Sequence, residues 1–586
     1  MPSGLSIQDF VIFSPVIVLT VWGLLSLIID LTLLAGQDST TRNRSLGMFT
    51  LSGLVASLVL CQYISYKYIG PSPGTDPLIF FGSLNGGVLF NQFASLVILF
   101  AVLITCLSMV WNFTSHWGEY YAMLVWSAVS MIILIAAEDL LTLFLALETM
   151  TICLYLMTAM EKSKQRSAEA GLKYFVYGSV SSALFLFGLS LIYGLTGSLS
   201  ISEIGLVLSS TQQPGLTGNV VGGVAVLLIL VGFGFKVSAV PFHQWAPDVY
   251  EGAPAPVSAW LASGSKLASL VAMVKVMGGG LGSWAATSTP TSPGWVGLLA
   301  MIAAATMTYG NFAALGQKNL KRLLAYSSIA HAGYMLVGVI AVGLSTEPEE
   351  AAAALFFYLV VYGLTTIAGF ALAAWIDRDR GTEEVEDLNG LARRHPYVGV
   401  AVCILMLSMI GIPPTAGFFG KLYMFMEALN VGGPDKVTMM GLVALGLFNS
   451  VVSAFYYVRI LKAMFFRDTQ RAELKWMGPE IALPLGLGTV LTLFFGLNSS
   501  VLLTDMESVS RSGLHITRRN PDPLDYNKPA PRTTRPSRLK PPEPSKPAEA
   551  AKPSGTTKPL AAAKTSAVIN VPAQAEGPGA AASAKP

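Results

Sequence analysis

Residues 411–425 read GIPPTAGFFGKLYMF, and they directly follow the apolar run VGVAVCILMLSMI at 398–410. Two adjacent prolines and a lysine therefore stand inside a stretch that is long and apolar enough to cross a lipid bilayer. Both residue types are unfavourable there, because a lysine near the bilayer centre costs about 2.5–3.5 kcal/mol and a proline frees backbone groups that lipid cannot bind. The stretch predicts a broken transmembrane helix with an ionisable group close to the break.

The composition of the whole chain is that of a polytopic, all-α membrane protein. Of its 586 residues, 53% are hydrophobic and 12% are charged, and the mean hydropathy is +0.58. Soluble domains carry about 25% charged residues. Apolar runs of about 20 residues predict about fourteen transmembrane spans. We place these spans at 11–34, 46–68, 90–112, 120–137, 140–160, 170–194, 219–241, 256–277, 295–315, 322–343, 350–375, 398–429, 438–465 and 480–503.

The loops carry an orientation signal. Clusters of lysine and arginine follow odd-numbered spans, whereas the loops after spans 6, 8 and 10 contain neither residue. The positive-inside rule therefore places the odd-numbered exits in the cytoplasm and both ends of the chain outside. Single lysines near even-numbered exits, such as Lys275, run against this trend without reversing it.

Two further features limit where chemistry is expected. From about residue 518 the chain is rich in proline, alanine, lysine and serine and has almost no aliphatic pattern, which predicts a disordered tail. The four cysteines lie in apolar runs and show neither CxxC nor Cys/His spacing, so we expect no metal or iron–sulfur site on this chain.

Charged side chains deep inside the spans are the strongest functional signal. There are four of them, namely Glu148, Lys236, Lys266 and Lys421. One carboxylate cannot neutralise three lysines, and burial favours the neutral amine of a lysine without a partner, which then takes up and releases protons. The set predicts a proton-handling unit in which the position of Glu148 changes the proton affinity of Lys236. For any one of these residues a structural ion pair is the alternative.

Prolines accompany two of these lysines. Lys236 is followed by Pro241, and Lys421 is preceded by the prolines at 413–414. Interrupted helices in both halves of a chain are typical of inverted-repeat transporters whose path lies at the breaks, although a kink without function is the alternative at either proline. His331 suits a proton relay because imidazole titrates near neutral pH, and a hydrogen-bonded packing role is the equal alternative. Other polar side chains that are candidates for bridging the lysines are Ser263, Ser265, Tyr326, Ser327, Ser328, Thr365 and Thr366.

Four segments resemble, in order, signatures of the antiporter-like membrane subunits of respiratory complex I, and among these subunit N. They are GFGFKVSAVPFHQWAPDVYEGAPAPVSAWLASGSK at 232–266, KNLKRLLAYSSIAHAGYMLVG at 318–338, GIPPTAGFFGKLYMF at 411–425 and SVVSAFYYVRILK at 450–462. The resemblance extends over about residues 10–505. Lys421 favours subunit N, because subunit M carries glutamate at this position. The tail departs from the family's pattern.

The resemblance implies a role for each candidate residue. Glu148 corresponds to the glutamate of span 5 that pairs with Lys236 of span 7, and Lys266 corresponds to the bridging lysine of span 8. Lys421 corresponds to the lysine of span 12 near the exit, and His331 on span 10 lies opposite Glu148. The resemblance also implies that spans 4–8 and 9–13 form two inverted five-helix repeats, with broken helices 7 and 12. The expected divisions are accessory helices at 1–115, the first repeat at 116–280, the second repeat at 281–468, the last span at 469–517 and the tail at 518–586.

The expected function is therefore that of a proton-translocating subunit N of NADH:quinone oxidoreductase, an enzyme subunit without a redox centre of its own. Flavin mononucleotide, iron–sulfur clusters and quinone are expected on partner subunits. The expected partners are the other membrane and peripheral subunits and the lipid bilayer, with no nucleic acid, in a bacterial inner membrane. The alternatives are a subunit of a multi-subunit cation/proton antiporter or membrane-bound hydrogenase, and a membrane scaffold that pumps nothing.

Overall fold

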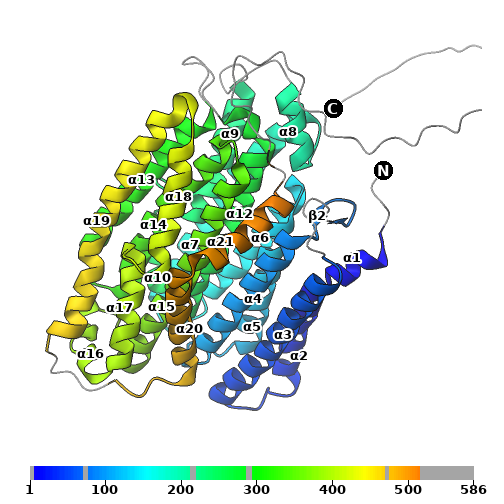
Figure 1. The fold of residues 1–586 in the computed structure, drawn as a ribbon. Helices are drawn as coiled ribbons and strands as arrows, with labels where there is room; N and C mark the ends of the chain where they lie inside the picture. The colour runs from blue at the N-terminus through cyan, green and yellow to red at the C-terminus, as the bar shows by residue number, and fades with distance from the viewer. Residues whose placement is uncertain are drawn as a thin grey trace, which may run out of the picture. The chain divides into compact units, whose positions relative to one another are not determined.

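The computed structural model describes residues 5–69, 77–210, 220–285, 294–468, 474–514 and 516. Its described part is built of helices, with one two-stranded sheet (Figure 1). Thirteen helices in this part are long and apolar enough to cross a membrane. The all-helical polytopic fold predicted from the sequence is confirmed, whereas the tail predicted for 518–586 lies outside the described residues.

Eight helices and a hairpin come before the first broken span. The helices are α1 (Ile7–Ile12), α2 (Ser14–Thr32), α3 (Ser39–Lys67), α4 (Val88–Ser108), α5 (Trp117–Ala136), α6 (Leu140–Thr158), α7 (Gln165–Thr196) and α8 (Ile201–Ser210). Strands β1 (Leu78–Ile79) and β2 (Leu84–Asn85) pair antiparallel between α3 and α4. The hydropathy pattern did not predict the hairpin or α8, because neither has the length of a span.

The seventh span is broken, as predicted, and the eighth contains unexpected π-helical turns. Span 7 consists of α9 (Val220–Val237) and α10 (Trp245–Gly252). Span 8 runs from Ala255 to Gly280. Its parts are α11 (Ala255–Trp260), the π-helical η1 (Leu261–Ser265), α12 (Lys266–Val274) and the π-helical η2 (Lys275–Gly280). A π-helical turn is rare and is often found at functional sites, so its place directly before Lys266 is informative.

The remaining spans follow in sequence order. Their elements, with the short turns between them, are η3 (Gly282–Trp284), α13 (Trp295–Leu315), α14 (Leu320–Leu344), α15 (Pro348–Arg380), η4 (Val385–Leu388), α16 (Leu391–Arg394), α17 (Pro396–Ile410), α18 (Ala416–Asn430), η5 (Gly433–Asp435), α19 (Lys436–Phe466), α20 (Pro479–Leu497) and α21 (Ser499–Gly513). The span predicted at 398–429 is the broken pair α17 and α18. Together with the thirteen long helices it accounts for the predicted total.

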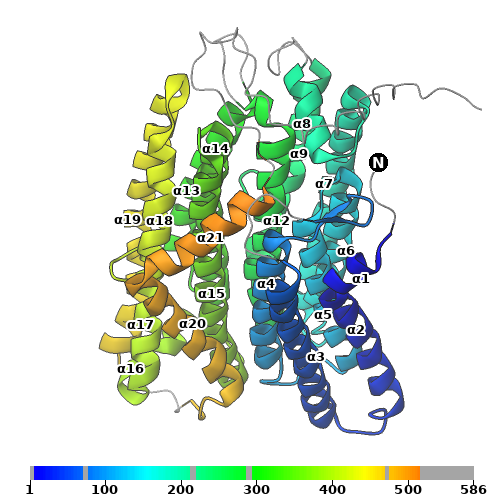
Figure 2. The same ribbon diagram turned by 45° about the vertical axis from the view of Figure 1, so that its right-hand side comes forward.

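Two groups of helices, from α5 to span 8 and from α13 to α19, show the same contacts at corresponding positions. A basic side chain binds the last carbonyls of α5, where Lys275 Nζ lies 2.5 Å from Ala137 O, and another binds those of α13, where Arg459 Nη1 lies 2.8 Å from Leu315 O. The loop before α6 and the loop before α14 each form an antiparallel bridge with the chain that follows the next helix, Asp139 with Ser200 and Asn319 with Glu384. In Figure 2, α8 follows the first bridge at one end of the bundle, and α16 follows the second at the other end.

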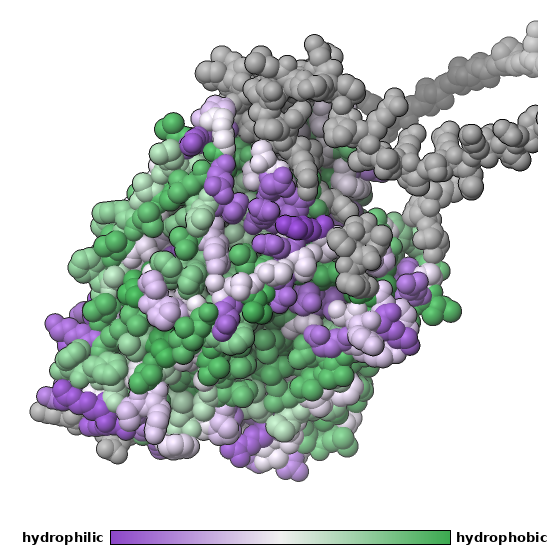
Figure 3. All heavy atoms as spheres, viewed as in Figure 1, coloured by the Kyte–Doolittle hydropathy of each residue, from purple (hydrophilic) through white to green (hydrophobic). Residues whose placement is uncertain are grey.

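Apolar residues cover much of the outside of the bundle. On the face in Figure 3 they fill most of the lower half, and hydrophilic residues gather at the lower edge, in the upper middle and at the right. Large apolar side chains of α19 are exposed, among them Val451 and Phe455. Such a surface is favourable in lipid, where helices satisfy their own backbone hydrogen bonds.

Candidate functional site

Glu148 and Lys236 lie near each other, and each is bound by a hydroxyl group. Ser182 Oγ on α7 donates to Glu148 Oε1 at 2.5 Å. Lys236 Nζ donates to the hydroxyl of Thr151, which lies one turn beyond Glu148 on α6. Within the part of the chain that the structure describes, no ion pair within 4.0 Å joins Glu148 to Lys236. In this structure the pairing that the resemblance implies is therefore not a direct contact. The Glu148 carboxylate acts on the buried Lys236 side chain through its charge at longer range.

Glu148 lies at the edge of the bundle. Its side chain is only half-buried, and the same helix exposes Leu145 and Ile152 on either side of it. The depth of Glu148 along α6 agrees with the sequence, but this chain alone does not enclose the carboxylate. A half-exposed carboxylate on an apolar transmembrane face requires a cover, because lipid offers it no hydrogen bond.

The break in span 7 places Lys236 at the end of α9. The freed backbone groups are bound within the protein, because Val240 N donates to Thr306 Oγ1 at 2.9 Å and Trp245 Nε1 donates to Phe235 O at 3.1 Å. Lys236 itself is 4% exposed. The break therefore holds a buried amine next to irregular backbone, an arrangement that membranes tolerate only inside protein.

Lys266 links the two groups of helices. Its ammonium is buried and donates to Ser328 of α14 twice, to the carbonyl at 2.8 Å and to Oγ at 2.5 Å. The hydroxyl of Tyr362 on α15 also donates to Ser328 Oγ, at 2.8 Å. Ser328 was among the bridging candidates from the sequence, whereas Tyr362 was not. Within the described residues Lys266 has no carboxylate within 4.0 Å, so its hydrogen-bond partners are neutral.

His331 lies on the same face of α14, three residues after Ser328. Its Nδ1 lies 2.6 Å from the hydroxyl of Tyr358, and its Nε2 lies 3.2 Å from the hydroxyl of Tyr457. The ring is buried and lies within electrostatic range of both Lys266 and Lys421. An imidazole held at both nitrogens by hydroxyl groups can accept a proton at one nitrogen and release one from the other.

The break in span 12 explains why a lysine is found near two prolines. Gly411 ends α17 with a left-handed φ of +93°, and a Cβ there would lie 3.2 Å from the Lys421 side chain. The helix therefore stops before its last carbonyls find partners. Lys421 Nζ binds the carbonyls of Met409 and Ile410 and the hydroxyl of Ser450, each at 2.9 Å. The break supplies the polar cage that the ammonium needs.

The structure places Lys266, His331 and Lys421 in one polar line along α14, whereas Glu148 and Lys236 form a separate polar cluster on α6 and α9. Side chains three residues apart on a helix share a face. On this face of α14, Ser328 binds Lys266, His331 follows one turn later, and Tyr334 faces Lys421. Lys421 Nζ lies 4.9 Å from the centre of the Tyr334 ring. The tyrosines were missed from the sequence because aromatic residues in apolar runs are usually packing residues. For Tyr334 the spacing of three residues after His331 was an available signal, whereas Tyr358, Tyr362 and Tyr457 lie on other helices.

Two buried ion pairs outside this line were also missed. Lys275 Nζ lies 2.7 Å from Glu138 Oε1, and Lys321 Nζ lies 2.6 Å from Glu383 Oε1. Lys275 is therefore a buried, paired residue, which explains why it departs from the charge pattern of the loops. In the loop after α15, burial raises the pKa of Glu383 despite the opposing charge of Lys321.

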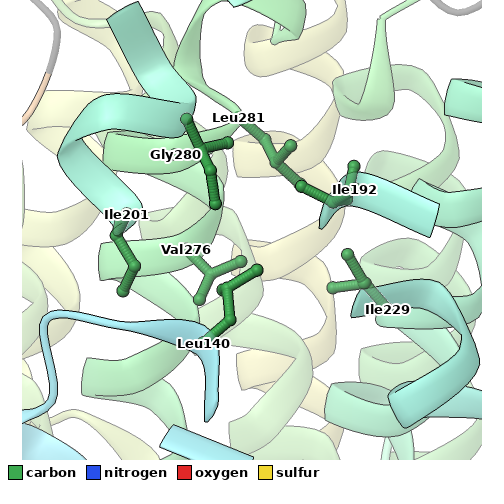
Figure 4. Close-up of a pocket in the computed structure, with 8 residues that line it drawn as sticks. Leu140, Ile192, Ile201, Ile229, Val276, Gly280 and Leu281 are labelled. Carbon is green, nitrogen blue, oxygen red and sulfur yellow. The ribbon is translucent and has the colours of Figure 1, made fainter. Parts of the chain in front are cut away.

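A pocket lined by residues of α6, α7, α8, α9 and span 8 lies apart from this line. The residues labelled in Figure 4 are all apolar or glycine. Such walls offer no ligand to an ion or a polar cofactor. Among the described residues, no group of three or more histidine, cysteine, aspartate or glutamate side chains is placed to hold a metal ion.

Comparisons with known proteins identify relatives of this chain. The family model described as "NADH:quinone oxidoreductase/Mrp antiporter, TM" matches residues 137–451. NADH-quinone oxidoreductase subunit N of Rhodospirillum rubrum is 38% identical over 76% of this chain and 88% of its own length.

Two solved structures have the same fold. A chain of respiratory complex I from Thermus thermophilus with bound aureothin is 31% identical with a TM-score of 0.68, covering 84% of this chain and 99% of that one. A chain of a membrane-bound sulfane sulfur reductase, an archaeal respiratory membrane complex, is 25% identical with a TM-score of 0.70, covering 85% and 98%. With its broken spans and buried lysines, this chain belongs to the NADH-quinone oxidoreductase subunit N family.

Proposed function

We propose that this chain is the proton-translocating membrane subunit N of an NADH:quinone oxidoreductase complex. The observation that carries the proposal is the set of buried titratable groups at two helix breaks and a π-helical turn, namely Lys236, Lys266, His331 and Lys421. Such groups are unfavourable in a membrane interior and usually mark an ion path. Relatives that carry the name NADH-quinone oxidoreductase subunit N support the assignment.

The first step is electrostatic. When the Glu148 carboxylate moves toward Lys236, the amine binds a proton more tightly, and when it moves away the proton is released. Moving one charge against 100 mV requires about 2.3 kcal/mol. Removing one partner of a buried ion pair changes the free energy by about 3–5 kcal/mol. The free-energy change on bringing Glu148 into a buried ion pair with Lys236, with which it is not in contact in this structure, and separating the two again would therefore be large enough to drive the transfer of one proton.

The later steps use the polar line. Lys236 and Lys266 exchange a proton through buried water, Ser328 positions the Lys266 amine, and His331 passes the proton on to the second group of helices. Lys421 then releases it on the opposite side of the membrane. No redox chemistry occurs on this chain in this scheme. Flavin mononucleotide, iron–sulfur clusters and quinone belong to partner subunits, as the implied membership of complex I requires.

The position of Glu148 suits a partner subunit. A neighbouring membrane subunit that covers α6 and α7 would enclose the half-exposed carboxylate, so that a conformational change in that neighbour reaches Glu148 first. The setting is a bacterial inner membrane, since the relatives are bacterial.

We also propose that 116–280 and 281–468 are inverted repeats, between accessory helices at 1–115 and a last span at 469–517. The matching carbonyl contacts of Lys275 and Arg459 support this division.

The test removes only the charge of Glu148. In Glu148→Gln the amide oxygen still accepts from Ser182, but it no longer acts on Lys236 as a charge. We expect NADH-driven proton uptake by inverted membrane vesicles to fall at least about fivefold per complex, since coupling between sites is typically worth 1–3 kcal/mol. Glu169→Gln on α7, an exposed carboxylate, is the matched control and should pump normally. Wild-type pumping in an assembled Glu148→Gln complex would support a scaffold instead.

The second candidate is a cation/proton antiporter, because the matching family model includes Mrp antiporters. The two functions differ in what drives the proton. Sodium/proton exchange by the purified assembly without flavin or iron–sulfur partners would favour the antiporter. Proton uptake that requires NADH oxidation would favour the oxidoreductase.

A further inference from the structure

The hydrogen-bonding chain divides at His331. One nitrogen of the ring faces Tyr358 of α15, and the other faces Tyr457 of α19. Both tyrosines are buried. A proton that reaches His331 therefore has two side-chain branches by which to leave it, and the contacts beyond each tyrosine decide which branch conducts.

The Tyr457 branch ends at an amide. Tyr457 binds the hydroxyl of Ser327 and packs against Tyr456 with ring centres 4.4 Å apart. Tyr456 Oη donates to Asn311 Oδ1 at 3.0 Å, and Asn311 Nδ2 donates to the hydroxyl of Tyr334 at 2.9 Å. A hydroxyl both donates and accepts a hydrogen, whereas the carboxamide oxygen only accepts and its nitrogen only donates. Hydrogen hopping along this branch therefore stops at Asn311.

The Tyr358 branch leads toward Lys421. The ring of Tyr358 packs against Gly420, where an added Cβ would lie 2.6 Å from Tyr358 Cδ2. Lys421 is the next residue of α18. The only hydrogen bond of the Tyr358 hydroxyl among the described residues is to His331, so its second hydrogen-bonding position is open.

We infer that Tyr358 conducts the proton between His331 and Lys421, and that Asn311 closes the other branch. The inference rests on the proposed function and adds its route. In the conducting step, imidazolium at His331 gives its Nδ1 hydrogen to the Tyr358 oxygen. The phenol gives its own hydrogen on the Lys421 side, where the neutral amine becomes ammonium. Imidazole and ammonium replace imidazolium and amine, so that atoms and charge balance.

Two matched substitutions test the route. Tyr358→Phe and Tyr456→Phe each remove one buried hydroxyl that hydrogen-bonds a buried polar side chain, His331 or Asn311, so their effects on folding should be alike. We expect Tyr358→Phe to lower NADH-driven proton uptake about tenfold per assembled complex, less than the 10²-fold or more typical of acid–base groups because water partly replaces a hydroxyl. Tyr456→Phe should pump as wild type. Equal pumping by the two variants, or a larger loss in Tyr456→Phe, overturns the inference.

If the Tyr358→Phe complex does not assemble, a gain-of-function variant tests the inference at the closed branch instead. Asn311→Asp puts a carboxyl group, which both accepts and releases hydrogen, in the closed branch. We expect vesicles without NADH to lose an imposed pH gradient faster than wild type. Asn43→Asp is the control, because the Asn43 amide also accepts from a buried tyrosine, Tyr121 at 2.7 Å, but lies on α3 away from the lysines. An unchanged leak in Asn311→Asp contradicts the closed branch.

The proposed function and the route fail in different ways. If Lys421→Met and His331→Gln complexes pump as wild type, the proposed function itself is wrong. If these variants lose pumping while Tyr358→Phe and Tyr456→Phe remain equal, only the route is wrong.

Discussion

Replacing Lys266 by methionine should abolish most proton translocation while the complex still assembles. Lys266 is the only side chain of span 8 with a hydrogen bond to Ser328 in the described structure, and methionine has a similar length without a proton-carrying group. Groups that transfer protons typically contribute 10²–10⁴-fold, so we expect NADH-driven proton uptake to fall about 100-fold. The measurement is dye quenching in inverted vesicles, normalised to the amount of complex on a native gel.

The control for Lys266→Met is Lys436→Met, at the exposed start of α19. This variant also replaces a lysine side chain by methionine, but at a site away from the polar line, so proton uptake should be unchanged. Retained pumping in Lys266→Met would mean that protons cross between the two groups of helices without this amine.

Replacing Lys275 by methionine should cause the largest loss of stability among the lysine variants. The change leaves the Glu138 carboxylate buried without its partner at 2.7 Å and also frees the carbonyl of Ala137. Breaking one side of a buried pair typically costs about 3–5 kcal/mol. The measurement is the free energy of unfolding in detergent micelles. The double variant Lys275→Met/Glu138→Leu should recover most of the loss, because it removes both charges.

An exposed pair provides the comparison for Lys275. Arg393 and Asp468 are also in contact, but their side chains are 56% and 87% exposed. Water screens such pairs, and their loss costs about 0–1 kcal/mol. If Arg393→Met and Lys275→Met lost equal stability, or if the double variant were no better than Lys275→Met, burial would not be the source of the effect.

Much of the candidate site was predictable because charge in an apolar run is conspicuous. Glu148, Lys236, Lys266 and Lys421 were identified by their cost in the membrane, and the prolines beside two of them predicted broken helices that the structure contains. The functional roles of these residues stay predictions. Lys275 was noted only as a single lysine near the exit of a span, and its ion pair was not predicted, because Glu138 is far away in the sequence and no local pattern reveals a long-range ion pair.

The sequence by itself determined that this is a polytopic helical membrane protein, because hydrophobicity and span length act locally along the chain. It also determined which ionisable groups enter the membrane. Only the tertiary structure decided what surrounds them: that Glu148 stands at the edge bound by Ser182, that Lys266 meets Ser328, and that His331 lies between two tyrosines. Those contacts depend on how helices far apart in the sequence pack against one another, and a hydropathy pattern carries no information about that packing.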